Sequence, residues 1–176
     1  RLPMILGCDG AGVDPDGNEV IVHAVVPSDG WRGDETLDPR RTLLSELHDG
    51  TLAQKVAVPT ANLVPKPEGL SWEHAACLST AWLTAYRMLF GHRPHVLRPG
   101  HNVLVWGAAG GLGAFAVQLC ATSGANAVGI VSDDDKRDFV MQLGAKGVIN
   151  RKNFDCWGQL PDVDYAAGYA AYMKKC

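Results

Sequence analysis

The sequence predicts an α/β protein in which a β-rich first part precedes a parallel sheet with helices between its strands. Residues 19–26 (EVIVHAVV) are an almost continuous β-branched run between turn residues, which is typical of a strand. From Asn102 onward, short apolar runs alternate with helical patterns, which indicates parallel strands joined by right-handed crossovers.

The first 65 residues are predicted to be mostly β-structure. Residues 51–59 (TLAQKVAVP) alternate apolar and polar side chains, which predicts a half-buried strand. Residues 28–41 are polar and contain Gly30, Gly33 and Pro39, so we expect a surface loop there.

A helix is predicted to follow Pro65 and Pro67, and a junction between two domains is placed within it. Ser71 stands in the position of an N-cap, and Glu73 in the first turn suits the positive end of the helix dipole. Apolar side chains follow at helical spacing, and the helix is expected to end near Gly91.

Three strands with two helices between them are predicted in the second half, the strands at residues 103–106, 127–131 and 148–149. The first helix is expected to bury an apolar stripe: Leu112, Phe115, Ala116 and Leu119. Gly144 is placed as the left-handed cap of the second helix. Further on, residues 153–161 are predicted to be a loop and 165–175 a short helix.

A glycine-rich turn, residues 107–113 (GAAGGLG), directly follows the first of these strands and opens a helix. Backbone N–H groups and the positive end of the helix can hold a pyrophosphate there, provided that no large Cβ keeps the backbone away from it. The strand-helix-strand order makes this a Rossmann-type dinucleotide motif. The candidate cofactor-binding residues in it are Gly107, Ala109, Gly110, Gly111, Leu112 and Gly113. The alternative is a tight turn without a ligand.

The end of the second predicted strand bears on which nicotinamide cofactor binds. Enzymes for NAD usually place an acid there to hold the ribose hydroxyls, whereas enzymes for NADP offer cations to the 2′-phosphate. Ser132 takes the position of the acid, and Lys136 and Arg137 lie one helical turn further on, which favours NADPH. Two alternatives stay open: the two cations are only a solvated helix start, or the register differs by one residue, so that Asp133 is the acid and NAD is favoured.

Composition argues against several classes of protein. A net charge of -3 provides no basic field for nucleic acid. The apolar stretches fall short of the roughly 20 residues that cross a bilayer, and the first residues lack the pattern of a signal peptide, so we expect no membrane partner. Five scattered cysteines without a CxxC pair indicate reduced thiols in a cytoplasmic protein, and no His/Cys spacing fits zinc, so no metal is predicted.

Residues 51–144 resemble the zinc-independent medium-chain dehydrogenase/reductases. The resemblance rests on GTLAQKVAVP, NLVPKPEGLSWEHAACLSTAWLTAYRML and RPGHNVLVWGAAGGLG. It implies a partial GroES-like β-barrel catalytic domain over residues 1–80. A Rossmann cofactor-binding domain, incomplete at its C-terminal end, is implied over residues 81–176. The resemblance also implies a homo-oligomer, either a dimer or a tetramer.

Residues 84–161 resemble one subgroup, the crotonyl-CoA carboxylase/reductases, on TAYRMLFGHRPHVLRPGHNVLVWGAAGGLGAFAVQL and GIVSDDDKRDFVMQLGAKGVINRKNFDCWGQLP. That family reduces an α,β-unsaturated acyl-CoA with NADPH and can trap the resulting enolate with carbon dioxide. The resemblance implies that the glycine-rich turn contacts the pyrophosphate, and that Ser132, Lys136 and Arg137 contact the 2′-phosphate. It also implies that Thr84 lies near the nicotinamide, as a candidate catalytic residue.

The first half departs from that subgroup, because LPMILGCDGAG and WRGDETLDPRR are more similar to zinc-free alcohol or quinone dehydrogenases. In the carboxylating enzymes, a Trp-Gly-aromatic-Glu segment helps to position carbon dioxide. Residues 43–46 (LLSE) keep the acid as Glu46, the second catalytic candidate, but have Ser45 in place of the aromatic residue, which argues against carboxylation. Glu46 on a solvated loop is the alternative. Two other functions therefore stay open: an alcohol or quinone oxidoreductase acting on small unsaturated carbonyls, and a non-catalytic dinucleotide-binding fragment.

Overall fold

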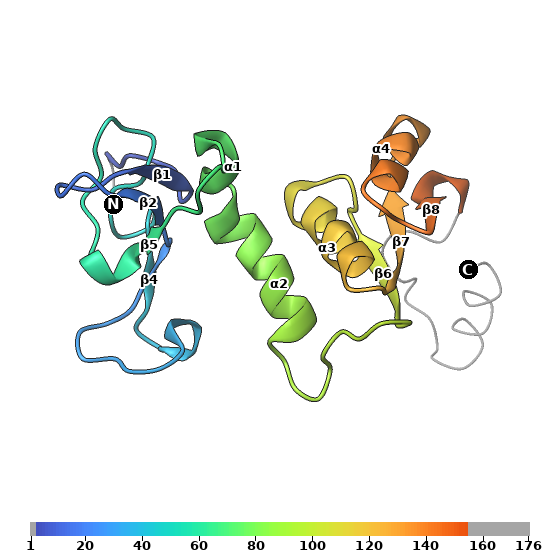
Figure 1. The fold of residues 1–176 in the computed structure, drawn as a ribbon, viewed down its shortest axis with the longest axis horizontal. Coiled ribbons are helices and arrows are strands. Elements are labelled where there is room, and N and C mark those ends of the chain that lie inside the picture. Colours follow the sequence, from blue (N-terminus) through green and yellow to red (C-terminus); the bar gives the residue numbers. More distant parts are fainter. Residues whose placement is uncertain (1–2, 155–176) are drawn as a thin grey trace, which may run out of the picture. The chain divides into compact units, whose positions relative to one another are not determined.

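The computed structural model describes residues 3–154, and the chain divides into two compact units after Thr84. The first unit holds two small antiparallel sheets, and the second holds a parallel sheet with its connecting helices (Figure 1). The sequence-based domain boundary, between residues 80 and 81, falls earlier in the same helical region. The helix expected at residues 165–175 lies outside the described residues, as does the predicted loop beyond Phe154.

The strands of the first unit are short. β1 (Gly10–Val13), β2 (Glu19–Val22) and β5 (Leu63–Pro65) form one sheet in the order β1-β2-β5, and β3 (Val25–Val26) pairs with β4 (Thr42–Leu43). Short 3₁₀ helices lie at Glu35–Leu37 and Thr60–Asn62. The core of this unit is built from Val22, Val26 and Leu44.

The β-branched run at residues 19–26 is two strands in two sheets, not one continuous strand. Asn62 is the reason for the break, because it is buried and binds the backbone between the two strands. Its carbonyl oxygen accepts from His23 N at 2.8 Å, and its Nδ2 donates to the carbonyls of His23 (2.8 Å) and Val25 (2.6 Å). These backbone groups are therefore not available to continue a single ladder.

The strand predicted at residues 51–59 does not form. Val56 and Val58 do pack against the core of the first unit, so the alternation correctly marks the buried side of the segment. Alternation reports which side chains are buried, but a strand also needs a neighbouring backbone to pair with. Among the described residues, this segment has no such partner strand.

A buried carboxylate anchors the loop at residues 28–41. Asp38 is fully buried, and its two oxygens accept hydrogen bonds from Ser28 N at 2.7 Å and Arg40 N at 2.8 Å. His23, beside this loop, lies 3.0 Å from Glu35 through its Nε2. The His23 ring therefore has a polar partner within the first unit.

The predicted helix begins and ends where expected. The Ser71 side chain accepts from His74 N at 3.3 Å, and the helical region ends at Phe90. It is nevertheless interrupted, and its three parts are α1 (Trp72–Ala76), a π-helical segment (Leu78–Trp82) and α2 (Leu83–Phe90).

Asp9 explains the π-helical segment. Its Oδ1 accepts from Ser79 Oγ and from Thr80 N, each at 3.2 Å. A side chain that takes a backbone N–H inside a helix disturbs the regular hydrogen-bond ladder and favours a local change of pitch. This contact joins residues that are far apart in the sequence, which is why helical periodicity did not predict it.

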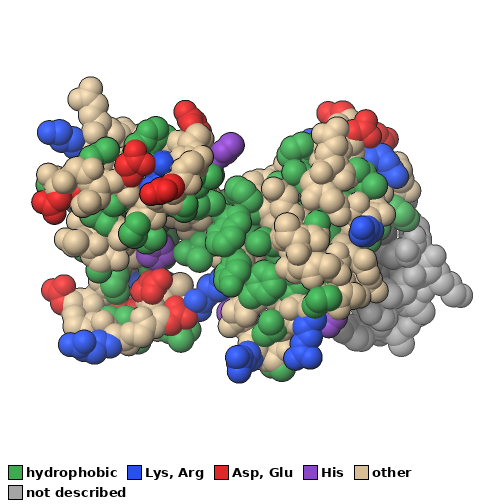
Figure 2. Space-filling model, viewed as in Figure 1, with side chains coloured by type: hydrophobic (Ala, Val, Ile, Leu, Met, Phe, Trp, Pro, Cys, Tyr) green, Lys and Arg blue, Asp and Glu red, His purple; other side chains and the backbone are tan. Residues whose placement is uncertain are grey.

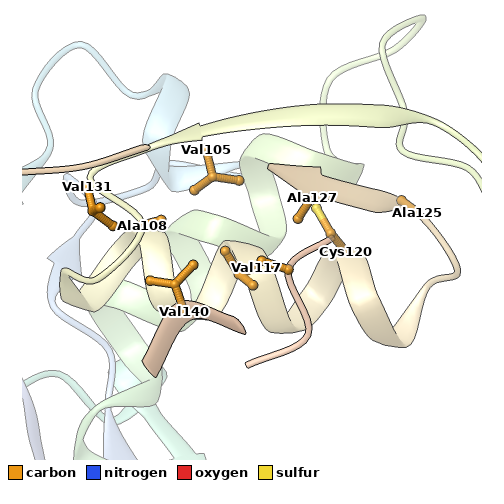
Figure 3. Packing of buried hydrophobic residues seen from close by; sticks show 9 residues of the cluster. Val105, Ala108, Val117, Cys120, Ala125, Ala127, Val131 and Val140 are labelled. Carbon is orange, nitrogen blue, oxygen red and sulfur yellow. The ribbon is translucent and has the colours of Figure 1, made fainter. Parts of the chain in front are cut away.

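The second unit confirms the predicted alternation of strands and helices. Its elements are β6 (Asn102–Trp106), α3 (Gly111–Thr122), β7 (Asn126–Val131), α4 (Arg137–Gln142) and β8 (Gly147–Asn150), with 3₁₀ helices at Asp134–Lys136 and Arg151–Asn153. The three strands are parallel, in the order β6-β7-β8. Both helices cover the same face of the sheet, because Val117 of α3 and Val140 of α4 belong to one buried cluster with Val105 and Val131 (Figure 3).

Small and β-branched side chains fill the space between the sheet and the helices (Figure 3). Helix α3 buries Gly113, Val117 and Cys120 against it. Of the predicted stripe, Ala116 packs against this core, whereas Leu112 is 40% exposed, so the prediction was only partly right. The helix is apolar almost all round, and for such a helix the spacing of apolar residues does not select the buried side. Gly144 does end α4 in the left-handed conformation, with φ at 103°.

We expect Gly129→Ala to destabilise the second unit. A Cβ at Gly129 would lie 2.7 Å from Val140 Cγ1 and 2.8 Å from Ala108 Cβ. The resulting overpacking should cost about 1–3 kcal/mol in the free energy of unfolding, measured by urea denaturation. Gly147→Ala in the adjacent strand is the matched control, because its Cβ would meet only Val128 Cγ1, at 4.0 Å. Equal effects of the two substitutions would contradict this account of the packing.

Candidate functional site

A cavity of about 360 Å³ lies where the three parallel strands of the second unit end. Its lining comes from the turn after β6, the end of β7 and the segments that follow β7 and β8: Trp106, Gly107, Ala109, Gly110, Ile130, Val131, Ser132, Lys136 and Arg151. Open parallel sheets bind ligands at the carboxyl ends of their strands, and this cavity has that position.

The glycine-rich turn brings α3 unusually close to the end of β6. A Cβ on Gly113 would lie 2.3 Å from the carbonyl oxygen of Gly107 and 2.8 Å from Ala108 Cα. Ala108 N donates to Ile130 O at 3.0 Å, which ties the turn to β7. Gly107 itself has φ at 65°, a conformation that glycine adopts without strain.

The N-terminus of α3 suits an anionic ligand. Its N-cap, Gly110, has no side chain to bond the first N–H groups, and the first turn carries no acid. These N–H groups and the positive end of the helix dipole favour a phosphate. The exposed Gly107 and Gly110 leave the backbone open to close approach, so the residues present fit a pyrophosphate.

Two of the three side chains assigned to the 2′-phosphate line the cavity. Lys136 Nζ donates to Ser132 Oγ at 2.8 Å, and both residues face the cavity. Arg137 is not among the lining residues, because its Nη1 donates to the carbonyl of Val148 at 3.2 Å. Gly111, Leu112 and Gly113 form the first turn of α3, behind the residues that line the cavity.

Arg151 lines the cavity and was missed by the sequence analysis. The parallel register pairs Val131 with Asn150, so the residues that follow, Ser132 and Arg151, leave adjacent strand ends together. The sequence feature that could have identified Arg151 is the position of this cation at the end of the third predicted strand.

An acid also lies at this end of the sheet. Asp133 Oδ1 forms an ion pair with Lys152, and Asp133 Oδ2 accepts from Ser132 Oγ at 3.0 Å. The hydrogen bond from Lys152, followed by that from Ser132, holds the pKa of the Asp133 carboxyl below its usual value. Asp133 is therefore ionised at neutral pH, but it is not among the residues that line the cavity.

The two catalytic candidates, Glu46 and Thr84, belong to the first unit, and both are exposed. Glu46 follows Ser45, which has φ at 70° and accepts from Gly7 N through its Oγ at 3.1 Å. Ser45 thus has a structural role in a tight turn. The catalytic roles of Glu46 and Thr84 stay predictions.

Cys8 lies close to Glu46. Its Sγ donates to the carbonyl of Leu44 at 3.3 Å. Burial raises the pKa of the Cys8 thiol, and the negative charges of Asp9 and Glu46 raise it further. The thiol is therefore neutral at neutral pH, which is the less reactive and less metal-binding form of a cysteine.

Within residues 3–154, no group of three His, Cys, Asp or Glu side chains is arranged to hold a metal ion. In the same part of the chain, no helix has both the length and the apolar character that spanning a bilayer demands. On the face drawn in Figure 2, Lys and Arg side chains are scattered among acidic ones and do not form one continuous basic surface.

The fold and the site define a Rossmann-type dinucleotide-binding domain preceded by part of a second domain. The chain is 54% identical to the crotonyl-CoA carboxylase/reductase of Cereibacter sphaeroides over 165 residues, which are 90% of this chain and 38% of that protein. It is 35% identical to a zinc-type alcohol dehydrogenase-like protein of Schizosaccharomyces pombe, over 89% of this chain and 47% of the relative. No protein-family model matches the chain.

Solved structures give the same result. A crotonyl-CoA carboxylase/reductase superposes with a TM-score of 0.88 and 48% identity, covering 98% of this chain and 44% of that one. The crotonyl-CoA carboxylase/reductase AntE in complex with NADP superposes with a TM-score of 0.89 and 35% identity, over 97% of this chain and 46% of that one. The chain belongs to the medium-chain dehydrogenase/reductase superfamily, whose enzymes carry a GroES-like domain, and the predicted fold class is confirmed. It spans less than half the length of these relatives.

We expect Glu46→Gln to lower the pKa of the Cys8 thiol, because it removes one of the negative charges that oppose the thiolate. Alkylation of Cys8, followed against pH by peptide mass spectrometry, should then begin at a lower pH. Glu68→Gln is the control, since it removes an exposed acid that does not contribute to the Cys8 shift. An unchanged profile in Glu46→Gln would place the Glu46 carboxylate away from the thiol.

Proposed function

We propose that this chain carries the NADPH site of an enoyl-CoA reductase, which reduces an α,β-unsaturated acyl-CoA such as crotonyl-CoA. The observation that carries the proposal is the cavity at the strand ends, where an uncapped helix N-terminus meets Ser132, Lys136 and Arg151. The 54% identity to a crotonyl-CoA carboxylase/reductase supports the substrate class, and the NADP in related structures supports the cofactor.

In this proposal, the two ends of the cavity hold different phosphates. The backbone of the turn at Gly107 and Gly110, with the N-terminus of α3, binds the pyrophosphate. Ser132, Lys136 and Arg151 bind the 2′-phosphate, for which a hydroxyl and two cations are the matching donors. Arg137 stabilises the fold through Val148 and does not take part in this contact.

The cofactor supplies a hydride from its nicotinamide ring. The role of the chain is to position the nicotinamide ring against the β-carbon of the substrate. It also stabilises the negative charge that develops on the thioester oxygen. We assign Thr84 to the nicotinamide side, as the family resemblance implies, and Glu46 to the place of the acid in the segment that helps to position carbon dioxide in the carboxylating enzymes. The α-carbon then takes a proton, or carbon dioxide in a reductive carboxylase. By the same resemblance, the protein acts as a homo-oligomer, and its scattered cysteines favour the cytoplasm.

The turn at Ser45 favours a reductase that does not carboxylate its substrate. The φ of 70° at Ser45 and its hydrogen bond from Gly7 N commit this residue to the turn. Bulky side chains are rare in this backbone conformation. An aromatic residue at this position, which the carboxylating enzymes have, would lose the bond to Gly7.

A second candidate function is an alcohol or quinone oxidoreductase of the same superfamily. The relative from Schizosaccharomyces pombe, with 35% identity, supports it, as does an NAD-dependent alcohol dehydrogenase structure with 33% identity and a TM-score of 0.79. Such an enzyme needs no site for CoA and acts on small carbonyls.

The direct test is oxidation of NADPH by the full-length protein with crotonyl-CoA, with and without bicarbonate, and with NADH as control. We expect oxidation with NADPH and crotonyl-CoA, and butyryl-CoA as product in both conditions. Ethylmalonyl-CoA with bicarbonate would overturn the assignment of Ser45. Activity with quinones or small carbonyls alone would favour the second candidate, and absence of cofactor binding would leave a non-catalytic Rossmann domain.

We expect Lys136→Ala to weaken NADPH binding about ten-fold, because it removes a charge-assisted hydrogen bond to the 2′-phosphate from a half-exposed site. NADH lacks that phosphate, so its dissociation constant should hardly change. Arg137→Ala removes a cation from the next position and should leave the ratio of the two constants unchanged. The reverse pattern would show that Arg137, not Lys136, contacts the phosphate.

A further inference from the structure

The register of β7 and β8 sorts four side chains into two pairs. Val131 is paired with Asn150 at the end of the two strands, so Ser132 leaves beside Arg151. Asp133, the next residue, forms an ion pair with Lys152. Asp133 has an extended backbone, with φ at -151° and ψ at 150°, so its side chain and that of Ser132 point in opposite directions. In agreement, Ser132 and Arg151 line the cavity, whereas Asp133 and Lys152 do not.

Asn150 fixes the backbone of the second pair. It is buried, and its Oδ1 accepts from Lys152 N at 3.0 Å, which caps the 3₁₀ helix Arg151–Asn153. The cap holds Lys152 next to the end of β7. From there its ammonium forms an ion pair and a hydrogen bond with Asp133 Oδ1.

The Asp133 carboxylate is also in contact with the phosphate-binding group. Its Oδ2 accepts from Ser132 Oγ at 3.0 Å and lies 3.7 Å from Lys136 Nζ. A carboxylate that turned further toward Lys136 would compete with a phosphate for that cation. It would also offer ribose hydroxyls the acceptors that acids provide in NAD enzymes.

From this arrangement we infer that Lys152 is a positioning residue for cofactor preference. Its ammonium holds the Asp133 carboxylate away from the cofactor, which leaves Ser132, Lys136 and Arg151 to a 2′-phosphate. The inference rests on the proposed NADPH site and adds a residue that acts on that site through Asp133. The lowered pKa of Asp133 agrees with it, because the hydrogen bond from Lys152 is the largest cause of that shift.

The test is a double-mutant cycle in the full-length protein, with dissociation constants for NADPH and NADH measured by nicotinamide fluorescence. Lys152→Gln should lower the preference for NADPH over NADH about two- to five-fold, the range that an exposed ion pair supports. In an Asp133→Asn background, the same substitution should have no effect, because there is no carboxylate left to hold. Lys152→Arg keeps the ion pair and should behave as the unmodified protein. Lys146→Gln removes an equal charge before β8 and should change nothing.

If Lys152→Gln lowered the preference for NADPH equally in the unmodified protein and in the Asp133→Asn background, the Lys152 charge would act directly on the phosphate. That result would overturn the inference. An unchanged preference in Lys152→Gln would overturn it as well, while NADPH binding by the unmodified protein would leave the proposed function intact. Failure of the unmodified protein to bind NADPH would overturn the proposed function, and the inference with it.

Discussion

The close approach of α3 to the turn after β6 is the constraint on which the second unit depends. There is no room for a Cβ at Gly113, which would meet the carbonyl oxygen of Gly107 at 2.3 Å. Because the helix starts against the end of the strand, Val117 and Cys120 reach the sheet and become part of its core. The same approach aims the first N–H groups of the helix at the cavity. One backbone contact therefore determines both the packing of the unit and the position of its anion-binding end.

Features that depend on neighbours in the sequence were predictable. The glycine-rich turn, the Ser71 cap and the three parallel strands each follow from a few consecutive residues, and the structure has all of them. The second strand ends at Val131, so Ser132 comes where the sequence analysis placed it. For the same reason, the turn and two of the three proposed phosphate contacts were found from the sequence alone.

Features that depend on distant partners were not predictable. Asp9 binds Thr80, 71 residues away, and the π-helical segment follows from that contact. Asn62 divides a run that looks like one strand, and it acts from 39 residues beyond His23. Arg151 becomes a cavity residue only once the register of β7 and β8 is known. Helix α3 is apolar on most sides, so its buried face is decided by the sheet and not by its own pattern.

The pairing of Val131 with Asn150 has a consequence for how such sites change in evolution. A shift of one residue in a strand exchanges the faces to which all its side chains point. A deletion of one residue in the segment that leads into β8, with a shift of the register by one, would bring Asn153 beside Asp133 in place of Lys152, and so remove the restraint on Asp133 without substituting any residue of the site. Loop length, as well as residue identity, is then a variable through which descendants of this protein can change from one nicotinamide cofactor to the other.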